Sequence, residues 1–371
     1  MNTFKFWRKA SSLVLFGGLL ATAGAQTLEE TMQKLSEGAA KQYVAPIVSG
    51  IGSNLNAGWY HKAPPAKKFR FSIEGGAVVS GTFLGTGATT IDLKSNFRFD
   101  SSQADTLIAH SGVTFNMNNP PEKAAHDSLV NAIISKDIPV QIKGPTVIGS
   151  GDSSVKAVFS GQKFTYNAGV GGSRTDSIPA DTVDLKVKGL LGDFTSFPLP
   201  LVAPQVTLGT IYGTNFTFRW LPTMPLGDVG DFSFFGFGIQ HNPAVWLGTS
   251  LPVDLCVGYF HQDLTFGSLF DASTNAIGLD VSKQLGWRLL NITPYGGFQW
   301  ESSTMSFHYD QKIHDEATGS TTILPIKFDL EGENSTRLTV GVSIHVLILN
   351  LNADYNLAKY NSASVGIMFG I

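Results

Sequence analysis

The sequence contains little cysteine and little charge. Cys256 is its only cysteine, which excludes a disulfide scaffold and a cysteine-rich metal site. Only 15% of its residues are charged, whereas soluble proteins normally carry about 25%. Phenylalanine and glycine are abundant, with 26 Phe and 40 Gly in 371 residues. We interpret this composition as typical of a protein whose surface meets lipid.

Beyond the N-terminal region, the sequence has no apolar run long enough to cross a bilayer as a helix. Such a helix needs about 20 apolar residues, and the run over 10–20 is shorter. It follows a basic stretch and precedes Ala23-Gly24-Ala25, which predicts a cleaved secretory signal peptide over residues 1–25. Because only helices and closed barrels satisfy the backbone in lipid, the exported chain is either soluble or a barrel.

The charge balance indicates no nucleic-acid partner. Removing Lys5, Arg8 and Lys9 with the signal peptide leaves 23 basic against 29 acidic residues, a formal charge of −6. A mildly acidic chain does not attract a polyanion.

Residues 26–66 are predicted to form an N-terminal helical segment that acts as a barrel plug. Apolar residues recur at three-to-five-residue spacing over 28–51, which indicates a helix, and Pro46 is expected to kink or end its first part. The alternative is a periplasmic helix without a gating role. The candidate plug residues are Leu28, Met32, Leu35, Ile47 and Ile51.

From residue 67 to 371 the period of the pattern is two, which predicts strands. The first half has short candidate strands near 89–99, 107–117, 153–168, 182–190 and 204–220. Residues 119–150 interrupt the pattern with a helical stretch over 122–134, so we expect an inserted loop or helix there.

The alternation is clearest near the C-terminus. In 337–345 and 347–356, Leu, Val and Ile occupy one face while Thr, Ser, His, Asn and Asp occupy the other. This is the apolar-out, polar-in pattern of a membrane barrel. The residues expected to line the lumen are Thr339, Ser343, His345, Asn350, Asn352, Asp354 and Asn356.

A soluble sandwich is the alternative fold. Its outward face usually carries Lys and Glu, whereas the polar face here is mostly uncharged. We therefore predict an all-β fold, a transmembrane antiparallel β-barrel. Its expected size is about 14 strands, within a range of 12–16, since such barrels prefer even numbers.

Several segments resemble a poorly characterised family of Gram-negative outer-membrane β-barrel proteins. They include 227–232, 235–241, 251–254 and 353–361. More distantly, the layout of an N-terminal segment followed by a barrel is similar to the long-chain fatty-acid transporter family. The resemblance implies an architecture and a bacterial outer-membrane location, with barrel-assembly machinery as a partner of the C-terminal strand. The chain ends in Gly370-Ile371 rather than the terminal Phe typical of assembly signals, although Phe369 is in register.

Catalytic and metal-binding patterns are weak. His308, Asp310 and His314 could hold a divalent ion, but a solvated loop explains them better. The pair His261 and Asp263 fits a strand end in solvent better than an acid/base pair. Ser343 and His345 share a face without a third orienting group. We therefore expect no enzyme, no metal site and no cofactor.

The leading functional hypothesis is a passive outer-membrane channel or transporter for small or hydrophobic solutes. The alternative is a non-conducting structural or adhesive outer-membrane barrel whose loops carry the function. In both cases the expected surroundings are outer-membrane lipid.

Overall fold

The computed structural model describes residues 37–99, 101–168, 172–225, 231–247, 251–287, 289–315 and 320–371. The chain forms two compact units. The barrel unit consists, in its described part, of residues from 37 to 88 and from 190 to 371. The inserted unit is Thr89–Gly189.

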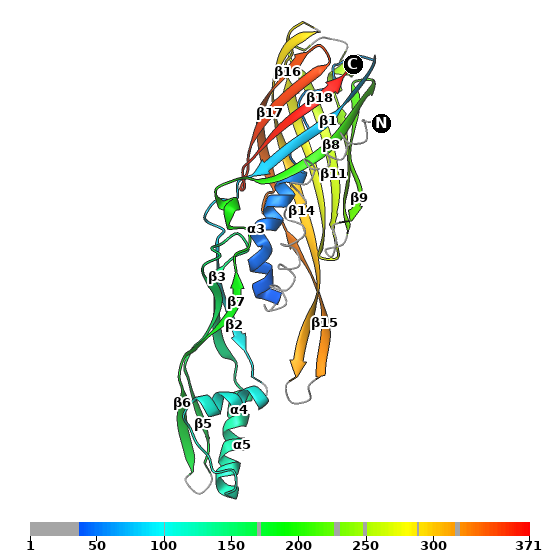
Figure 1. Ribbon diagram of the computed structural model, residues 1–371. Coiled ribbons are helices and arrows are strands. Elements are labelled where there is room, and N and C mark those ends of the chain that lie inside the picture. The colour runs from blue at the N-terminus through cyan, green and yellow to red at the C-terminus, as the bar shows by residue number, and fades with distance from the viewer. Residues whose placement is uncertain are drawn as a thin grey trace. The chain divides into compact units, whose positions relative to one another are not determined.

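Ten antiparallel strands close the barrel unit into a ring (Figure 1). The ring order is β1-β8-β9-β10-β11-β12-β14-β16-β17-β18, and it closes because β1 pairs with β18. Two further strands, β13 (Leu285–Gly286) and β15 (Ser320–Glu331), pair with β14 outside the ring. The ring strands are β1 (Phe69–Thr82), β8 (Leu199–Ile211), β9 (Thr214–Pro225), β10 (Asp231–His241), β11 (Asp254–Phe266), β12 (Phe270–Ser282), β14 (Leu290–Asp315), β16 (Thr336–Val346), β17 (Leu349–Leu357) and β18 (Ser362–Gly370). Short 3₁₀ helices are η2 (Gly192–Thr195) and η4 (Pro243–Trp246).

The strand number expected from the sequence, about 14, is therefore wrong. The excess arose because the segments near 89–99, 153–168 and 182–190 do form strands, but these belong to the inserted unit. A half-buried sheet produces the same period-two pattern as a barrel wall, so periodicity alone could not separate them.

The inserted unit has its own sheet and core. Its four-stranded sheet has the order β2-β3-β4-β7, and β5 pairs with β6. The insertion expected near 119–150 is thus part of a larger unit, and the segment expected as a strand near 107–117 contains the end of a helix. Its elements are β2 (Thr90–Phe97), α4 (Ser101–His110), α5 (Pro120–Ile134), β3 (Ile138–Pro145), β4 (Ser154–Phe159), β5 (Gln162–Asn167), β6 (Ser173–Ile178) and β7 (Asp181–Lys188). Its buried core includes Ala104, Ile108, Leu129, Ile133 and Phe164.

The two ends of the barrel differ. The C-terminal rim carries Ile371, the two-residue turns 212–213 and 347–348, and the longer connections 242–253 and 283–289. At the other end, the hairpin rim, β14 continues past its barrel neighbours and pairs over 308–315 with β15 alone, as Figure 1 shows. The connection 83–198, which contains the inserted unit, also leaves and rejoins the barrel at this rim, where Thr82 lies opposite Leu199.

The described N-terminal helix, α3, spans Glu37–Leu55. Of the two outcomes expected at Pro46, a kink or an end of the helix, the end does not occur, because α3 continues nine residues further. The ring of a proline removes one helical hydrogen bond, and here burial of the flanking turns outweighs that loss. Within the described residues, no helix has the length and hydropathy needed to cross a bilayer.

We predict that the barrel folds without the inserted unit. Because Thr82 and Leu199 are already register partners, a short Gly/Ser linker in place of 89–189 should leave the β1–β8 pairing intact. The variant should keep its heat-modifiable mobility on SDS gels. A variant that runs as unfolded protein before and after boiling would show that the barrel depends on the inserted unit.

Candidate functional site

The barrel wall has an apolar outer face and a polar inner face. Along β16, Leu338, Val340 and Val342 are exposed to the outside, whereas Thr339 and Ser343 are buried inside. This is the reverse of a soluble protein, in which polar groups face out and apolar groups face in. The side chains buried within the ring include Glu74, Gln205, Arg219, Gln262, Asp280, Glu301, Arg337 and Asp354.

The structure places six of the seven residues expected to line the lumen in buried positions on the inner face, and His345 is partly buried. Most of them bind one another or neighbouring wall residues. Asp354 accepts hydrogen bonds from Tyr295, Ser364 and Asn356, at 3.0, 2.6 and 2.8 Å. Thr339 donates to Asn356 (2.6 Å), and Ser343 donates to Asn350 (2.5 Å).

Residues 37–66, which we call the plug segment, enter the ring at the hairpin rim. The segment consists of α3, whose last turn contacts Thr82 and Leu199 at that rim, followed by an irregular stretch that passes through the interior of the ring and leads into β1. Ile47, expected as a plug residue, is buried, and Ile51 is partly buried. The other three expected plug residues, Leu28, Met32 and Leu35, lie outside the described residues.

An aromatic ladder lines the inner wall near the hairpin rim. Its rings pack in sequence across β10, β11, β12, β14 and β15, with centroid separations from 5.1 to 6.3 Å. In the first half of α3, Ala39, Ala40, Tyr43 and Val44 are buried, and Lys41 places its ammonium 5.4 Å from the Phe328 ring. The ladder consists of Phe234, Phe232, Phe266, Phe270, Phe307, Phe328 and Tyr309.

The second half of α3 meets the polar part of the wall and is itself small and polar. Its sequence from residue 49 to 54 is Ser-Gly-Ile-Gly-Ser-Asn. Asn54 donates to the Leu199 carbonyl (2.6 Å) and accepts from the Thr82 hydroxyl (2.8 Å). At Gly52 a Cβ would collide with the Ser303 side chain, so only glycine allows this approach.

Two buried arginines of the wall bind the C-terminal end of α3. Arg219, on β9, is 1% exposed and donates to the carbonyls of Leu55 (3.3 Å) and Ala57 (2.9 Å). Its guanidinium also binds Gln205 (2.9 Å) and lies 3.9 Å from the centre of the Trp59 ring. The last carbonyls of a helix lack partners and carry the negative end of its dipole, so they suit a cation.

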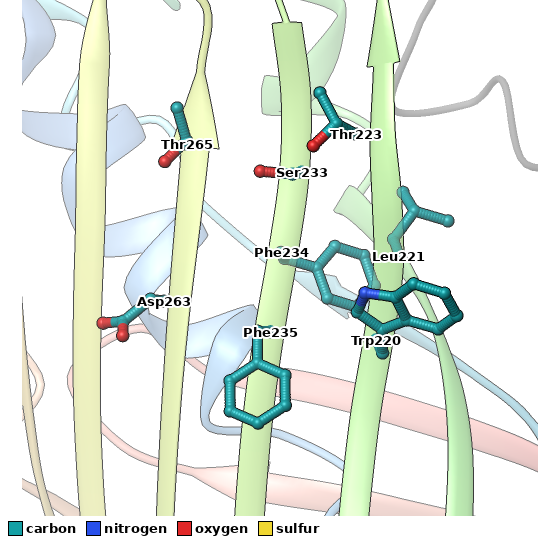
Figure 2. Close-up of a pocket in the computed structure, with 8 residues that line it drawn as sticks. All are labelled: Trp220, Leu221, Thr223, Ser233, Phe234, Phe235, Asp263 and Thr265. Atoms are coloured by element: carbon teal, nitrogen blue, oxygen red, sulfur yellow. The ribbon is translucent and has the colours of Figure 1, made fainter.

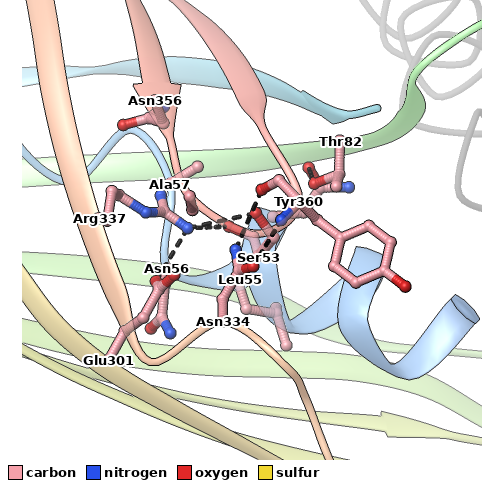
Figure 3. Close-up of polar contacts among 12 residues, drawn as sticks. Ser53, Leu55, Asn56, Ala57, Thr82, Glu301, Asn334, Arg337, Asn356 and Tyr360 are labelled. Atoms are coloured by element: carbon pink, nitrogen blue, oxygen red, sulfur yellow. Dashed lines mark hydrogen bonds and ion pairs between the residues drawn. The ribbon is translucent and has the colours of Figure 1, made fainter. Parts of the chain in front are cut away.

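The second arginine, Arg337, approaches the same helix end from β16 (Figure 3). It donates to the Ser53 carbonyl at 2.7 Å and forms an ion pair with Glu301 at 2.9 Å. Beside it, Asn334 and Tyr360 exchange two hydrogen bonds of 3.1 and 2.8 Å, which join the β15–β16 and β17–β18 connections. The helix end is therefore held from two sides of the ring.

Near the C-terminal rim, the irregular part of the plug is anchored by Glu74 of β1. This carboxylate lies 3.0 Å from both His61 and Lys62 of the plug and accepts a 2.9 Å hydrogen bond from Asn350. The backbone nitrogen of Ala63 donates to Ser282 (2.9 Å). A polar network thus continues along the plug to this end of the barrel.

The residues that hold the plug were not singled out from the sequence. Arg219, Arg337 and Glu74 follow the same alternation as the predicted lumen residues, since Arg219 lies between the outward Phe218 and Trp220. The alternation therefore could have predicted that Arg219 faces inward. It could not have predicted which group Arg219 binds, because Leu55 and Arg219 are 164 positions apart.

The outer face becomes polar toward the hairpin rim. Along β11, the exposed Leu255, Val257 and Tyr259 are followed on the same face by His261 and Asp263. The last two form a 3.0 Å ion pair on the outer wall. An open depression of about 320 Å³ lies at this transition. Figure 2 shows the residues that line it, which are Trp220, Leu221, Thr223, Ser233, Phe234, Phe235, Asp263 and Thr265.

The weak metal candidates named from the sequence lie beyond the ring: His308, Asp310 and His314 are on the part of β14 that pairs with β15 alone. Nowhere in the described part of the chain do three or more His, Cys, Asp or Glu side chains gather in a way that could hold a metal ion.

A sequence-family model described as "Family of unknown function (DUF6588)" matches residues 5–371. No curated protein matches the chain.

Solved structures that are similar to parts of the chain are outer-membrane proteins and a porin. The loop L8 deletion mutant of OmpT from Vibrio cholerae is 10% identical, with 83% of this chain and 100% of that chain covered and a TM-score of 0.23. The N-terminal β-barrel domain of Pseudomonas aeruginosa OprF is 13% identical (43% and 94% covered, TM-score 0.19). A triple mutant of the Rhodopseudomonas blastica porin is 10% identical (82% and 100% covered, TM-score 0.17). The fold of the present chain is established by its own strand pairing.

Replacing Arg219 tests whether its hydrogen bonds to the end of α3 stabilise the plug segment in the ring. In Arg219→Met, the Ala57 carbonyl and the Gln205 amide oxygen lose a buried donor, while the Leu55 carbonyl keeps the Trp59 indole N–H. Each unsatisfied group costs about 1–3 kcal/mol. We expect the free energy of unfolding to fall by roughly 2–4 kcal/mol, measured by tryptophan fluorescence in denaturant.

The matched control is Lys359→Met, which removes an exposed cation paired with Glu333. Exposed pairs contribute about 0–1 kcal/mol, so this change should be small. Equal effects of the two variants would contradict the clamp at the helix end.

Proposed function

We propose that this chain, which belongs to the family of unknown function DUF6588, is an outer-membrane β-barrel whose lumen is closed by its own plug segment. The observation that carries the proposal is the reversed polarity of the wall. A closed ring leaves no unpaired strand edges in lipid, and its exposed face is a band of Leu, Val, Ile and Phe. Acyl chains satisfy such a face, and water does not.

Aromatic side chains at the two rims support this placement. At the C-terminal rim, Tyr212 and Trp246 stack at 5.1 Å, and Trp287 is 79% exposed. Toward the hairpin rim, Trp220 and Trp300 are also exposed. Tyr and Trp concentrate at membrane–water interfaces because their rings are apolar with a polar edge.

The two longest excursions from the ring, the connection 83–198 and the β14–β15 hairpin, both lie at the hairpin rim, which favours one orientation. Barrels of this class have short periplasmic turns and longer extracellular loops. We therefore place the C-terminal rim in the periplasm and the hairpin rim outside. On this placement the C-terminal strand ends where barrel-assembly machinery could bind it, and the inserted unit is attached to the barrel at its external rim.

The occupied lumen favours a closed barrel over an open passive channel. Barrels of about eight strands are just wide enough for side chains to fill, and here a polypeptide segment fills a ten-strand ring as well. The best-supported role is a structural or adhesive one, in which the barrel anchors the inserted unit and the β14–β15 hairpin at the cell surface.

A gated channel is the second candidate. The observation that favours it is the charged inner wall, with Arg219, Arg337, Glu74 and Asp280 facing inward. These groups would line an aqueous path for small solutes if the plug segment left. Hydrophobic solutes would first meet the aromatic ladder.

A covalent lock on the plug distinguishes these roles. Ala63 of the plug and the native Cys256 of β11 belong to one buried cluster, so Ala63→Cys offers a disulfide between plug and wall. We expect no conductance steps in planar bilayers from the oxidised or the reduced variant.

The control is Ala63→Cys combined with Cys256→Ser, which cannot form the disulfide. Steps that appear only when the plug is unlocked would establish a gated channel. Steps in the locked protein would show that solutes pass around the plug and would contradict the closed barrel.

Lipid contact is tested by two arginine substitutions at equally exposed positions. Val340 (61% exposed) lies mid-strand and Ile348 (55% exposed) lies in a rim turn. Val340→Arg should lower the free energy of unfolding in vesicles by about 2–4 kcal/mol, and Ile348→Arg by about 0–1. In a protein surrounded by water the two changes would be equally mild, and that result would rule out the membrane placement.

A further inference from the structure

We infer that the chain threads the barrel from its external face to its periplasmic face, so that Glu37 is displayed outside the cell and Ile371 in the periplasm. The inference rests on the proposed outer-membrane placement. The proposed function requires only that the plug segment closes the lumen. The inference adds the direction in which this segment runs through the barrel.

The order of contacts along the plug segment gives the direction. Lys41 lies over Phe328 of β15, and the Ser49 hydroxyl accepts from the Glu333 backbone nitrogen at 3.2 Å, both at the hairpin rim. The helix end then meets Arg219 within the ring. Contacts therefore advance along the barrel as residue numbers rise.

The later residues of the plug reach the C-terminal rim. Ala63 binds Ser282, the last residue of β12, and the Asn242 amide donates to the Pro64 carbonyl at 2.7 Å. The carbonyls of Lys67 and Lys68 then accept hydrogen bonds from the 212–213 turn at 3.1 and 2.9 Å. From this rim the chain reverses into β1.

The length of the segment fits a complete passage. The last turn of α3 lies at the hairpin rim, where Asn54 contacts Thr82 and Leu199, so residues 56–66 make the passage. These residues can span at most about 36 Å. The apolar band of an outer-membrane barrel is about 25 Å tall. No contact in this series returns the described segment to the rim at which it began.

This threading direction determines which part of the plug segment is displayed at the external rim. The first turn of α3 and the β14–β15 hairpin lie together at the external rim, where Lys41 contacts Phe328. A plug that entered from the periplasm would display the opposite end of the chain.

Cysteine labelling on intact cells tests the direction. Cys256 is 2% exposed, so the wild-type protein supplies an unlabelled background. Glu37→Cys and Ile348→Cys place thiols at positions that are 53% and 55% exposed at opposite rims. The loss of the exposed Glu37–Lys41 pair costs little.

With a bulky membrane-impermeant maleimide on a Gram-negative host, we expect Glu37→Cys to be labelled on intact cells, several-fold above wild type. Ile348→Cys should reach the same level only after the outer membrane is permeabilised. Accessibility of Glu37→Cys only after permeabilisation, or labelling of both variants on intact cells, would overturn the inference.

Fractionation of the same cells separates failure of the inference from failure of the proposed function. If either of those labelling patterns occurs while the protein remains in the outer membrane, the threading direction alone is wrong. If the protein is recovered in the soluble fraction, the membrane placement has failed and the inference fails with it.

Discussion

The structure depends on hydrogen bonding between the polar inner wall and the N-terminal segment that fills it. A closed barrel with an apolar exterior must bury its polar side chains in a narrow interior. Buried polar groups cost free energy unless they are paired. The plug supplies those partners through its backbone carbonyls, which Arg219 and Arg337 bind at the end of α3.

This arrangement makes the plug part of the fold. Two wall arginines meet the negative end of the helix dipole, so helix, wall and lumen charge are matched to one another. The plug sequence also changes along its length as the wall does. Its apolar half faces the aromatic ladder, and its Ser, Gly and Asn residues face the polar region. Without the other, neither the plug nor the wall would have partners for these buried polar groups.

The alternation of apolar and polar residues predicted the faces of the strands but not the sheet to which each strand belongs. In β16 and β17 the period-two pattern indicated both faces, and the structure places Thr339 and Asn356 inside and Leu338 and Tyr355 outside. The same pattern in β2 and β4 led to an overcount, because those strands form a separate sheet. Periodicity reports that a strand has two different faces, without identifying what each face contacts.

The sequence by itself determined the local features: strands, their faces, a helical N-terminal segment, and a composition with few charges that suits lipid. Only the tertiary structure decided the ring of ten strands, the separate unit over 89–189, and the partners of the buried charges. The physical reason is the sequence separation between the interacting residues. Alternation arises from neighbouring residues, whereas ring closure joins β1 to β18 and the helix cap joins Leu55 to Arg219 across distant parts of the chain.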